Sequence, residues 1–300
     1  MSTSTSTPSR SRQGLPKVSR SRKVKDAIAT GLMWGAFALA MIPLVWVLGT
    51  VLVRGLPALL DIEWWTTSQR NIGAFDEGGG MLHALIGTLQ QAAIAAIIAV
   101  PFGILAGILL VEYPGNKLLK PVSFMTDVLT GIPSIVSALF IYAFFITFLG
   151  FNRSGFMVSL SLVILMLPVI IRGTEEMLRI VPNELREASL ALGVPRWKTV
   201  TRIVIPTAFT GIVTAVMLGL ARIMGETAPL LILVGYTPSI NTNPFEGEQA
   251  ALPLMINVER TNPLPAGQER AWGAALTLIL LVMLLNVGAR YLSRFSGMKK

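Results

Sequence analysis

The sequence of 300 residues contains no cysteine and a single histidine, His83. The lack of cysteine excludes a disulfide framework, a thiolate metal site and a cysteine nucleophile, and one histidine excludes a multi-histidine metal centre. Charged residues are also scarce, at 14% of the chain against about a quarter in ordinary soluble domains. No G-x-x-x-x-G-K-[ST] loop is present to hold the phosphates of a nucleotide. No activated serine or pair of catalytic carboxylates stands out either, so the sequence does not read as that of an enzyme.

Apolar residues dominate what is there. Hydrophobic residues make up 53% of the chain and its mean hydropathy is +0.65, values typical of an integral membrane protein. The formal net charge is +9. A basic chain can bind nucleic acid, but basic residues beside apolar segments have a commoner cause, the excess of Lys and Arg on the cytoplasmic side of membrane proteins. Composition therefore favours a membrane protein.

Six apolar segments approach or exceed the length of about 20 residues that a transmembrane helix needs, which predicts an all-α protein with six spans. The expected spans are residues 27–53, 83–111, 132–149, 155–171, 203–235 and 272–291. The fifth run has 33 residues, too many for one straight span, so we expect a break at Gly225-Glu226-Thr227-Ala228-Pro229. Residues 1–26 are rich in Ser, Thr, Pro and basic side chains, and predict a disordered tail before a membrane domain at 27–300.

Small and polar residues mark the second run. It contains Gly103-x-x-x-Gly107, a spacing that lets two helices approach closely. Near its expected outer end lie four polar residues: His83, Thr88, Gln90 and Gln91. Their side chains either line a path through the membrane or hydrogen-bond to a neighbouring helix, and the sequence leaves both alternatives open.

The distribution of Lys and Arg predicts the orientation of the chain. Nineteen of the 25 basic residues fall in the N-terminal tail, the connection between the second and third spans, the polar loop at 172–202 and the C-terminal segment. Five fall in the three opposite segments, and the remaining one, Arg222, lies inside the fifth run. By the positive-inside rule, both termini and the polar loop are expected in the cytoplasm.

The polar loop at 184–208 reads ELREASLALGVPRWKTVTRIVIPTA. Leu185, Ala188 and Leu192 recur at helical spacing, and Gly193 suits the end of a short amphipathic helix. Such a helix either docks onto another protein or lies solvated on the lipid headgroups. The pattern alone does not decide between the two.

The same loop resembles the EAA loop of ABC importer permeases. Glu187-Ala188-Ser189, then Gly193 after three residues, then Ile203-Val204-Ile205-Pro206 after nine more, match that motif with its spacing. The departures are Ser189 in place of the second alanine and Ile205 in place of leucine. The resemblance implies the type I permease fold and a separate ATPase subunit that carries ATP and Mg. The residues expected to contact that subunit are Glu184, Glu187, Ala188, Ser189, Gly193, Ile203 and Pro206.

Charges within the apolar runs are functional candidates, because a charged side chain in hydrocarbon is costly unless it meets a partner or water. Arg222 and Glu226 lie one helical turn apart, and Arg172 ends the fourth run. The pair is either a structural ion pair at the break or a site where the guanidinium meets a passing oxyanion. Arg172 either faces the same path or extends to the headgroups.

Two segments narrow the resemblance. Ala221-Arg222-Ile223-Met224-Gly225-Glu226-Thr227-Ala228-Pro229 and Gly131-Ile132-Pro133-Ser134-Ile135-Val136 are similar to the A-type permease subunit of phosphate-specific (Pst) ABC importers. This resemblance implies import of inorganic phosphate across a prokaryotic plasma membrane. It also implies a sister C-type permease, two copies of an ATP-binding subunit and an extracytoplasmic phosphate-binding protein. The residues expected along the substrate path are Arg222, Glu226, Thr227, Arg172 and Ser134.

Two other functions remain as alternatives. A permease of the same class for another oxyanion, such as sulfate or molybdate, would carry the same arginine, since a guanidinium attracts any of these anions. A stand-alone ion-driven transporter or channel would need no ATPase partner and often shows inverted internal repeats. No convincing repeat is present in the sequence, and the EAA-like loop would have no role there.

Overall fold

The computed structural model describes residues 19–73 and 75–297, with side chains as far as Tyr291. All regular secondary structure in this part of the chain is helical. The chain divides into two compact units, Met1–Thr50 and Val51–Lys300. The described part of the first unit belongs to α1 (Arg20–Leu60), which continues into the second. Of the predicted tail at 1–26, residues 1–18 lie outside the described residues, and the chain is helical from Arg20 onward.

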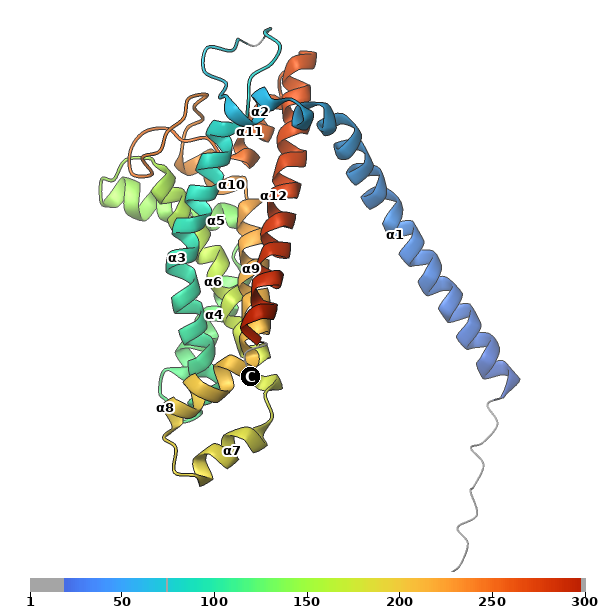
Figure 1. Cartoon of the computed structure of the whole chain (residues 1–300), viewed down its shortest axis with the longest axis vertical. Coiled ribbons are helices and arrows are strands. Elements are labelled where there is room, and N and C mark those ends of the chain that lie inside the picture. The colour runs from blue at the N-terminus through green and yellow to red at the C-terminus, as the bar shows by residue number, and fades with distance from the viewer. Residues whose placement is uncertain (1–18, 74, 298–300) are drawn as a thin grey trace, which may run out of the picture. The chain divides into compact units, whose positions relative to one another are not determined.

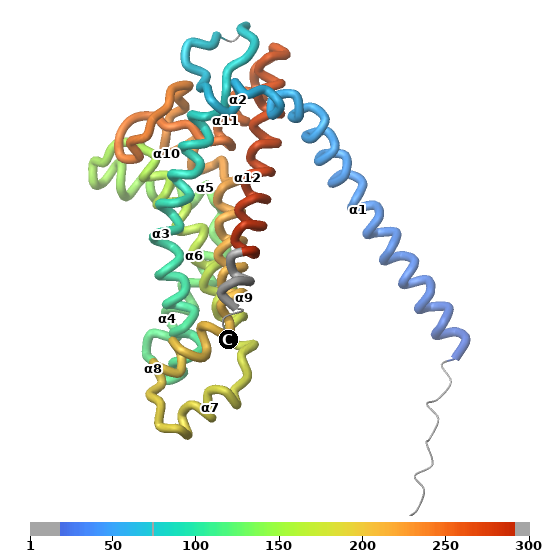
Figure 2. The backbone as a smooth tube through the Cα atoms, in the orientation of Figure 1, coloured from blue at the N-terminus to red at the C-terminus, as the bar shows by residue number. Residues whose placement is uncertain are grey.

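Five helices of the described chain are long and apolar enough to cross a membrane. Figures 1 and 2 show the path of the chain through its helices. The five are α1, α3 (Leu82–Glu112), α6 (Gly155–Ile180), the run Arg196–Met224 that contains α9 (Ile205–Met224), and α12 (Pro265–Gly297). The shorter helices are α2 (Ile62–Thr66), α4 (Leu119–Gly131), α5 (Ser134–Ile141), α7 (Asn183–Ala191), α8 (Arg196–Thr199), α10 (Ala228–Leu233), α11 (Leu252–Glu259) and the π-helices η1 (Tyr142–Phe148) and η2 (Val200–Val204). The prediction of an all-helical membrane protein is confirmed.

The third predicted span, 132–149, corresponds to the continuous α5–η1 segment, Ser134–Phe148. This segment meets the preceding helix, α4, at an angle of 109°, a bend that the sequence analysis did not predict. The bend falls at Ile132 and Pro133, both extended, because proline lacks an N–H and keeps the preceding residue out of the helical region. The described chain therefore has five unbroken candidate spans, or six if this bent pair crosses the membrane as one.

The predicted break in the fifth span is confirmed. Helix α9 ends at Met224, Gly225 is its C-cap, and α10 begins at Ala228 with a proline in its first turn. Helix α10 packs against both α5 and α6. The two segments that follow sharp breaks, α5 and α10, therefore lie side by side.

The crossing of α3 and α6 involves the two glycines of the second run. A Cβ on Gly103 would lie 2.7 Å from Ile170 Cγ2, and one on Gly107 would lie 2.7 Å from Thr174 Cβ. Only glycine allows α3 and α6 to meet at this distance, and no other helix pair in the described chain makes a more extensive contact. The predicted role of Gly103 and Gly107 is confirmed, and α3 and α6 form a tightly packed pair.

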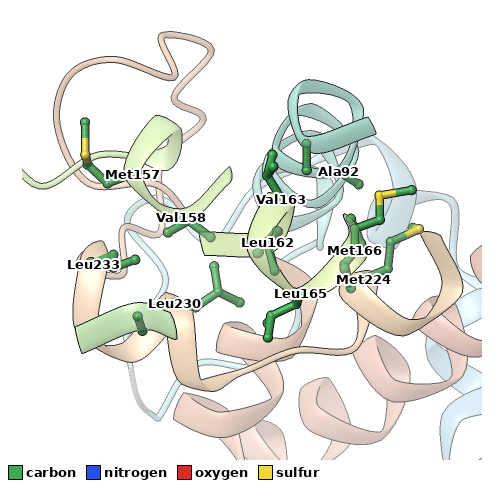
Figure 3. Packing of buried hydrophobic residues seen from close by; sticks show 14 of the residues in the cluster. Ala92, Met157, Val158, Leu162, Val163, Leu165, Met166, Met224, Leu230 and Leu233 are labelled. Atoms are coloured by element: carbon green, nitrogen blue, oxygen red, sulfur yellow. The ribbon is translucent and has the colours of Figure 1, made fainter. Parts of the chain in front are cut away.

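A hydrophobic core surrounds this pair. Figure 3 shows Val158, Leu162 and Leu165 of α6 between Ala92 of α3 and Leu230 of α10. These buried side chains hold the helices together by close van der Waals packing, the main attraction between helices in a bilayer, where lipid tails are as apolar as leucine. The core thus fixes the positions of α3, α6 and α10 relative to one another.

The polar segments lie at opposite ends of the second unit. Figure 1 shows α7 and α8 beyond one end of the bundle, and α2 and α11 at the other. Helix α12 runs toward the end that carries α7 and α8. The bundle therefore separates an end with the EAA-like loop from an end with the longer loops.

Candidate functional site

The EAA-like loop folds as two short helices. Helix α7 follows Pro182 and carries Glu184 in its first turn, where a carboxylate is favoured by the helix dipole. It ends at Ala191, and Gly193 follows the C-cap Leu192 with a φ of +75°, in the left-handed region, as expected for a glycine that terminates a helix. The N–H of Gly193 donates to the Leu190 carbonyl at 2.9 Å. After Pro195, α8 and η2 lead without interruption into α9.

Helix α7 presents apolar side chains to the surroundings. Leu185 and Leu190 are exposed, Leu192 is 83% exposed, and Trp197 of α8 is 58% exposed. Apolar groups gathered on a polar loop mark an interaction site, because water disfavours them. The predicted stripe of Leu185, Ala188 and Leu192 is therefore exposed in the isolated chain and free to dock.

The predicted contact residues of the loop divide into two groups. Most of them lie at the surface: Glu184, Glu187, Ala188, Gly193 and Pro206 are exposed and Ile203 is partly buried. Ser189 is different, because it is 3% exposed and its Oγ lies 2.9 Å from Thr199 Oγ1 on α8. The serine that departs from the family pattern thus joins the two halves of the loop from inside.

The break in the fifth span leaves its two charged residues apart. Arg222 is exposed and Glu226 is partly buried, and no ion pair joins them in the part of the chain described here. The proposed structural ion pair is therefore absent from this conformation. Glu226 instead lines a cavity of about 10 Å³ with Thr88 and Gln91, enough room for one water molecule.

The other predicted path residues lie on neighbouring elements. Thr227, partly buried, sits between α9 and α10, and Ser134, also partly buried, is the first residue of α5. The packing of α5 against α10 brings the two motif segments together. Arg222 is on the last turn of α9, next to that contact.

Arg172 is held by carboxylates from two helices. Its Nη1 donates to Glu175 Oε2 at 2.6 Å, and its Nη2 is hydrogen-bonded to Asp127 of α4. Glu175 also accepts from Arg179 Nη2 at 2.7 Å. These contacts connect α4 to α6, and the guanidinium of Arg172 is hydrogen-bonded to two carboxylates in this conformation. Its place on the substrate path stays a prediction.

The other end of the bundle contains a buried polar network. His83 Nε2 lies 3.1 Å from the Tyr236 hydroxyl, which donates to Gln69. Gln69 Nε2 donates to Glu259 Oε1 at 2.8 Å, and Arg270 Nε donates to the same oxygen at 3.1 Å. Burial, reinforced by the Glu259 carboxylate, raises the pKa of Tyr236 above its ordinary value. This network fastens the segments that carry Gln69, Tyr236 and Glu259 to α3.

The remaining polar residues of α3 are also bonded to neighbours. Thr88 Oγ1 accepts the Leu252 N–H at 2.8 Å, and Gln91 Nε2 donates to Gln249 Oε1 at 2.9 Å. Gln90 donates to the Thr242 carbonyl at 2.7 Å. Of the two alternatives for these residues, bonding to neighbouring segments is the one found in this structure.

Among the contacts that sequence reasoning missed is an ion pair between Glu112 at the end of α3 and Arg186 of α7, with Nη2 and Oε1 at 2.7 Å. The available signal was an acidic residue at the end of a long apolar run. Its partner lies 74 positions away and could not be identified from the local pattern.

The comparisons with known proteins agree with this architecture. Residues 99–296 match the family described as Binding-protein-dependent transport system inner membrane component. The phosphate transport system permease protein PstA of Mycobacterium leprae is 52% identical over 273 residues, 91% of this chain and 90% of its own length. PstA of Pasteurella multocida is 38% identical over 270 residues, 90% of this chain and 94% of its own length.

Solved structures of two transporters share the fold. A bacterial ABC transporter involved in the import of the acidic polysaccharide alginate aligns with a TM-score of 0.61 and 16% identity, covering 93% of this chain and 100% of its own. The MetNI methionine ABC transporter aligns with a TM-score of 0.57 and 21% identity, covering 72% and 94%. The predicted permease fold and transport role, rather than an enzymatic one, are confirmed. The chain belongs to the family of binding-protein-dependent transport system inner membrane components, as a multi-pass inner-membrane relative of the PstA permeases.

Proposed function

We propose that this chain is the permease subunit of an ATP-driven importer of inorganic phosphate and forms half of its translocation path. The observation that carries this proposal is the 52% identity to a PstA permease along 91% of the chain. The exposed guanidinium of Arg222, beside a break in a membrane-spanning helix, supplies the chemistry that an oxyanion needs.

In the proposed topology both termini and the EAA-like loop face the cytoplasm, with residues 1–26 as a tail and 27–300 as the permease domain. The excess of Lys and Arg on that side supports this orientation. The direction of α12, toward the end that carries α7, agrees with it (Figure 1). The ATPase then meets the loop on the side of the membrane where ATP is present.

The proposed partners account for surfaces that the chain leaves uncovered. Helix α7, with exposed Leu185 and Leu190, docks onto a separate subunit that binds ATP and Mg. A sister C-type permease completes the path as the other half of a heterodimer. An extracytoplasmic phosphate-binding protein delivers the solute at the end that carries α2 and α11.

The proposed path passes the break in the fifth span. An exposed arginine on a membrane-spanning helix has to face water or another protein, because hydrocarbon disfavours the charge. Arg222 meets the phosphate anion there, and Glu226 nearby keeps the anion from being held too tightly. Thr227 and Ser134 line the same region, and Arg172 lies along the path on its cytoplasmic side.

Coupling follows from the position of α7. Closure of the ATPase pair on ATP displaces α7, and the spans rock until the path opens outward. Phosphate enters, meets Arg222, and is released inward when hydrolysis reverses the motion. The chain itself holds no nucleotide.

The test is uptake of radioactive phosphate by proteoliposomes that contain the chain with its permease, ATPase and binding-protein partners. Uptake is expected only with ATP and only with the ATPase present. Excess sulfate or molybdate should leave phosphate uptake unchanged; strong competition would instead assign another oxyanion. Anion flux through the chain alone, without ATP, would contradict the proposal and favour a stand-alone transporter or channel.

A further inference from the structure

One arginine of the EAA-like loop is bound to the ends of two other helices. Arg186 of α7 donates through Nε and Nη2 to Glu112 Oε1, the last residue of α3, at 3.0 and 2.7 Å. Its Nη2 also donates to the Leu178 carbonyl of α6 at 2.8 Å, and Nη1 donates to the Val181 carbonyl at 2.6 Å. One side chain therefore connects the docking helix to the cytoplasmic ends of two membrane-spanning helices.

The guanidinium of Arg186 is fully hydrogen-bonded. Nη1 also lies 3.2 Å from Asn183 Oδ1, so that the five N–H groups of Arg186 all have acceptors. The Arg186 side chain is 15% exposed and that of Glu112 is 3% exposed. An ion pair of this kind is little screened by water and holds a fixed geometry. The contact therefore holds α7 firmly against the ends of α3 and α6.

The two helices that receive the contact behave as one body. Helices α3 and α6 cross without Cβ atoms at Gly103 and Gly107, where any side chain would clash. The opposite end of α3 is bonded to the outer segments through Thr88 and Gln91. Helix α3 therefore links the docking helix at one end of the bundle to the polar network at the other.

We propose that the Arg186–Glu112 pair is the joint that converts displacement of α7 into movement of the α3–α6 pair. This inference rests on the proposed function, in which α7 docks onto an ATPase. The pair does not touch the solute; it positions the helices that do. Without the joint, ATP hydrolysis continues while the spans no longer follow α7.

The first test removes both charges at once. Glu112→Leu with Arg186→Met leaves no buried charge without a partner, a replacement that proteins often tolerate without loss of stability. In the reconstituted transporter, we expect the phosphate transported per ATP hydrolysed to fall about tenfold or more, within the usual range of coupling between sites. ATP hydrolysis should stay near the level of the unaltered complex. The matched control is Arg179→Met, which removes an ion-paired arginine of α6 that makes no contact with α7.

The second test restores the joint by covalent chemistry. Because the chain contains no cysteine, Glu112→Cys with Arg186→Cys places two unique thiols at the joint. A short bifunctional thiol reagent should raise the phosphate-to-ATP ratio toward the unaltered value, and reduction should lower it again. Both states belong to one folded protein, so a folding defect does not imitate this result.

A third cysteine variant separates the joint from the docking site. Ala188→Cys on exposed α7 reports cross-linking to the ATPase. Suppose that the variant with Glu112→Leu and Arg186→Met still cross-links to the ATPase through position 188 and keeps an unchanged phosphate-to-ATP ratio. The role proposed for the Arg186–Glu112 pair is then wrong, and the proposed function stands. If Ala188→Cys alone gives no cross-link to the ATPase, both the role proposed for the pair and the proposed function are wrong. Failure of every joint variant to assemble would show that the pair serves folding only, which also overturns the inference.

Discussion

Two arginines of this chain occupy opposite kinds of surroundings. Arg186, at the joint between α7 and the bundle, has an acceptor for each N–H. Arg222, beside the break in the fifth span, is exposed and has no carboxylate partner among the described residues. A bound guanidinium holds elements together, whereas an exposed one on a membrane helix needs something that the chain does not supply. The first is suited to transmitting motion and the second to meeting a solute.

The comparison predicts different consequences for the two sites. Loss of Arg186 should destabilise the folded protein, and transport should fall as a consequence. Loss of Arg222 should damage transport and leave the fold intact. Two substitutions test this contrast directly, and two more test the packing of the helices and of the loop around the first site.

The largest effect is expected from Arg186→Met alone. It leaves the carboxylate of Glu112 buried without a partner, which costs about 3–5 kcal/mol of stability. We expect poor accumulation in the membrane and a markedly lower unfolding temperature of the purified protein. Adding Glu112→Leu should recover most of the loss; no recovery would show that the stability comes from other contacts of Arg186.

Arg222→Gln should affect uptake only. Losing a charged hydrogen bond to the anion, worth about 1.5–3 kcal/mol, lowers the rate of phosphate uptake about 10- to 100-fold. Stability should change by less than about 0.5 kcal/mol because the side chain is exposed. Arg260→Gln, an exposed arginine outside the spans, serves as the control and should transport normally. Normal uptake by Arg222→Gln would remove this residue from the path.

Gly107→Ala tests whether α3 and α6 act as one body. The new Cβ would lie 2.7 Å from Thr174 Cβ, so the helices have to separate, at a cost of about 1–3 kcal/mol. Thermal unfolding measures this cost. Gly115→Ala is the matched control, since its Cβ would meet no atom within 4 Å. Equal unfolding temperatures for both variants would contradict the close crossing.

The smallest effect concerns the inside of the EAA-like loop. Ser189→Ala leaves the buried hydroxyl of Thr199 without its partner, at a cost of about 1 kcal/mol. Adding Thr199→Val removes the unsatisfied group, and the double variant should regain most of the stability. A double variant less stable than either single one would show that the hydroxyl pair is not what joins α7 to α8.

Local chemistry explains which features could be predicted from the sequence. The apolar runs predict the long helices, Gly193 predicts the end of α7, and the excess length of the fifth run predicts its break. The glycines at 103 and 107 predict a close helix crossing because their lack of a side chain acts directly at the contact. In each case the physical cause lies within a few residues of the feature.

Features that depend on distant partners could not be predicted. The pairing of Glu112 with Arg186, and of Ser189 with Thr199, exists only after the chain has folded. The burial of Trp64 is similar, because its Nε1 donates to Thr277 Oγ1, 213 positions away, at 3.1 Å. The bend before α5 was missed, although Pro133 marks it, because the apolar run continues beyond the proline.

Cross-linking from α7 tests the central claim most directly. Ala188→Cys, in an assembled transporter with its ATPase subunit, is treated with a short thiol-reactive cross-linker. Asn152→Cys, an exposed position in the loop before α6, is the control at the other end of the bundle. The account predicts a cross-link to the ATPase from position 188 and none from position 152. If position 188 reacts only with water-soluble reagents and never with the ATPase, α7 is not the docking helix and the account is wrong.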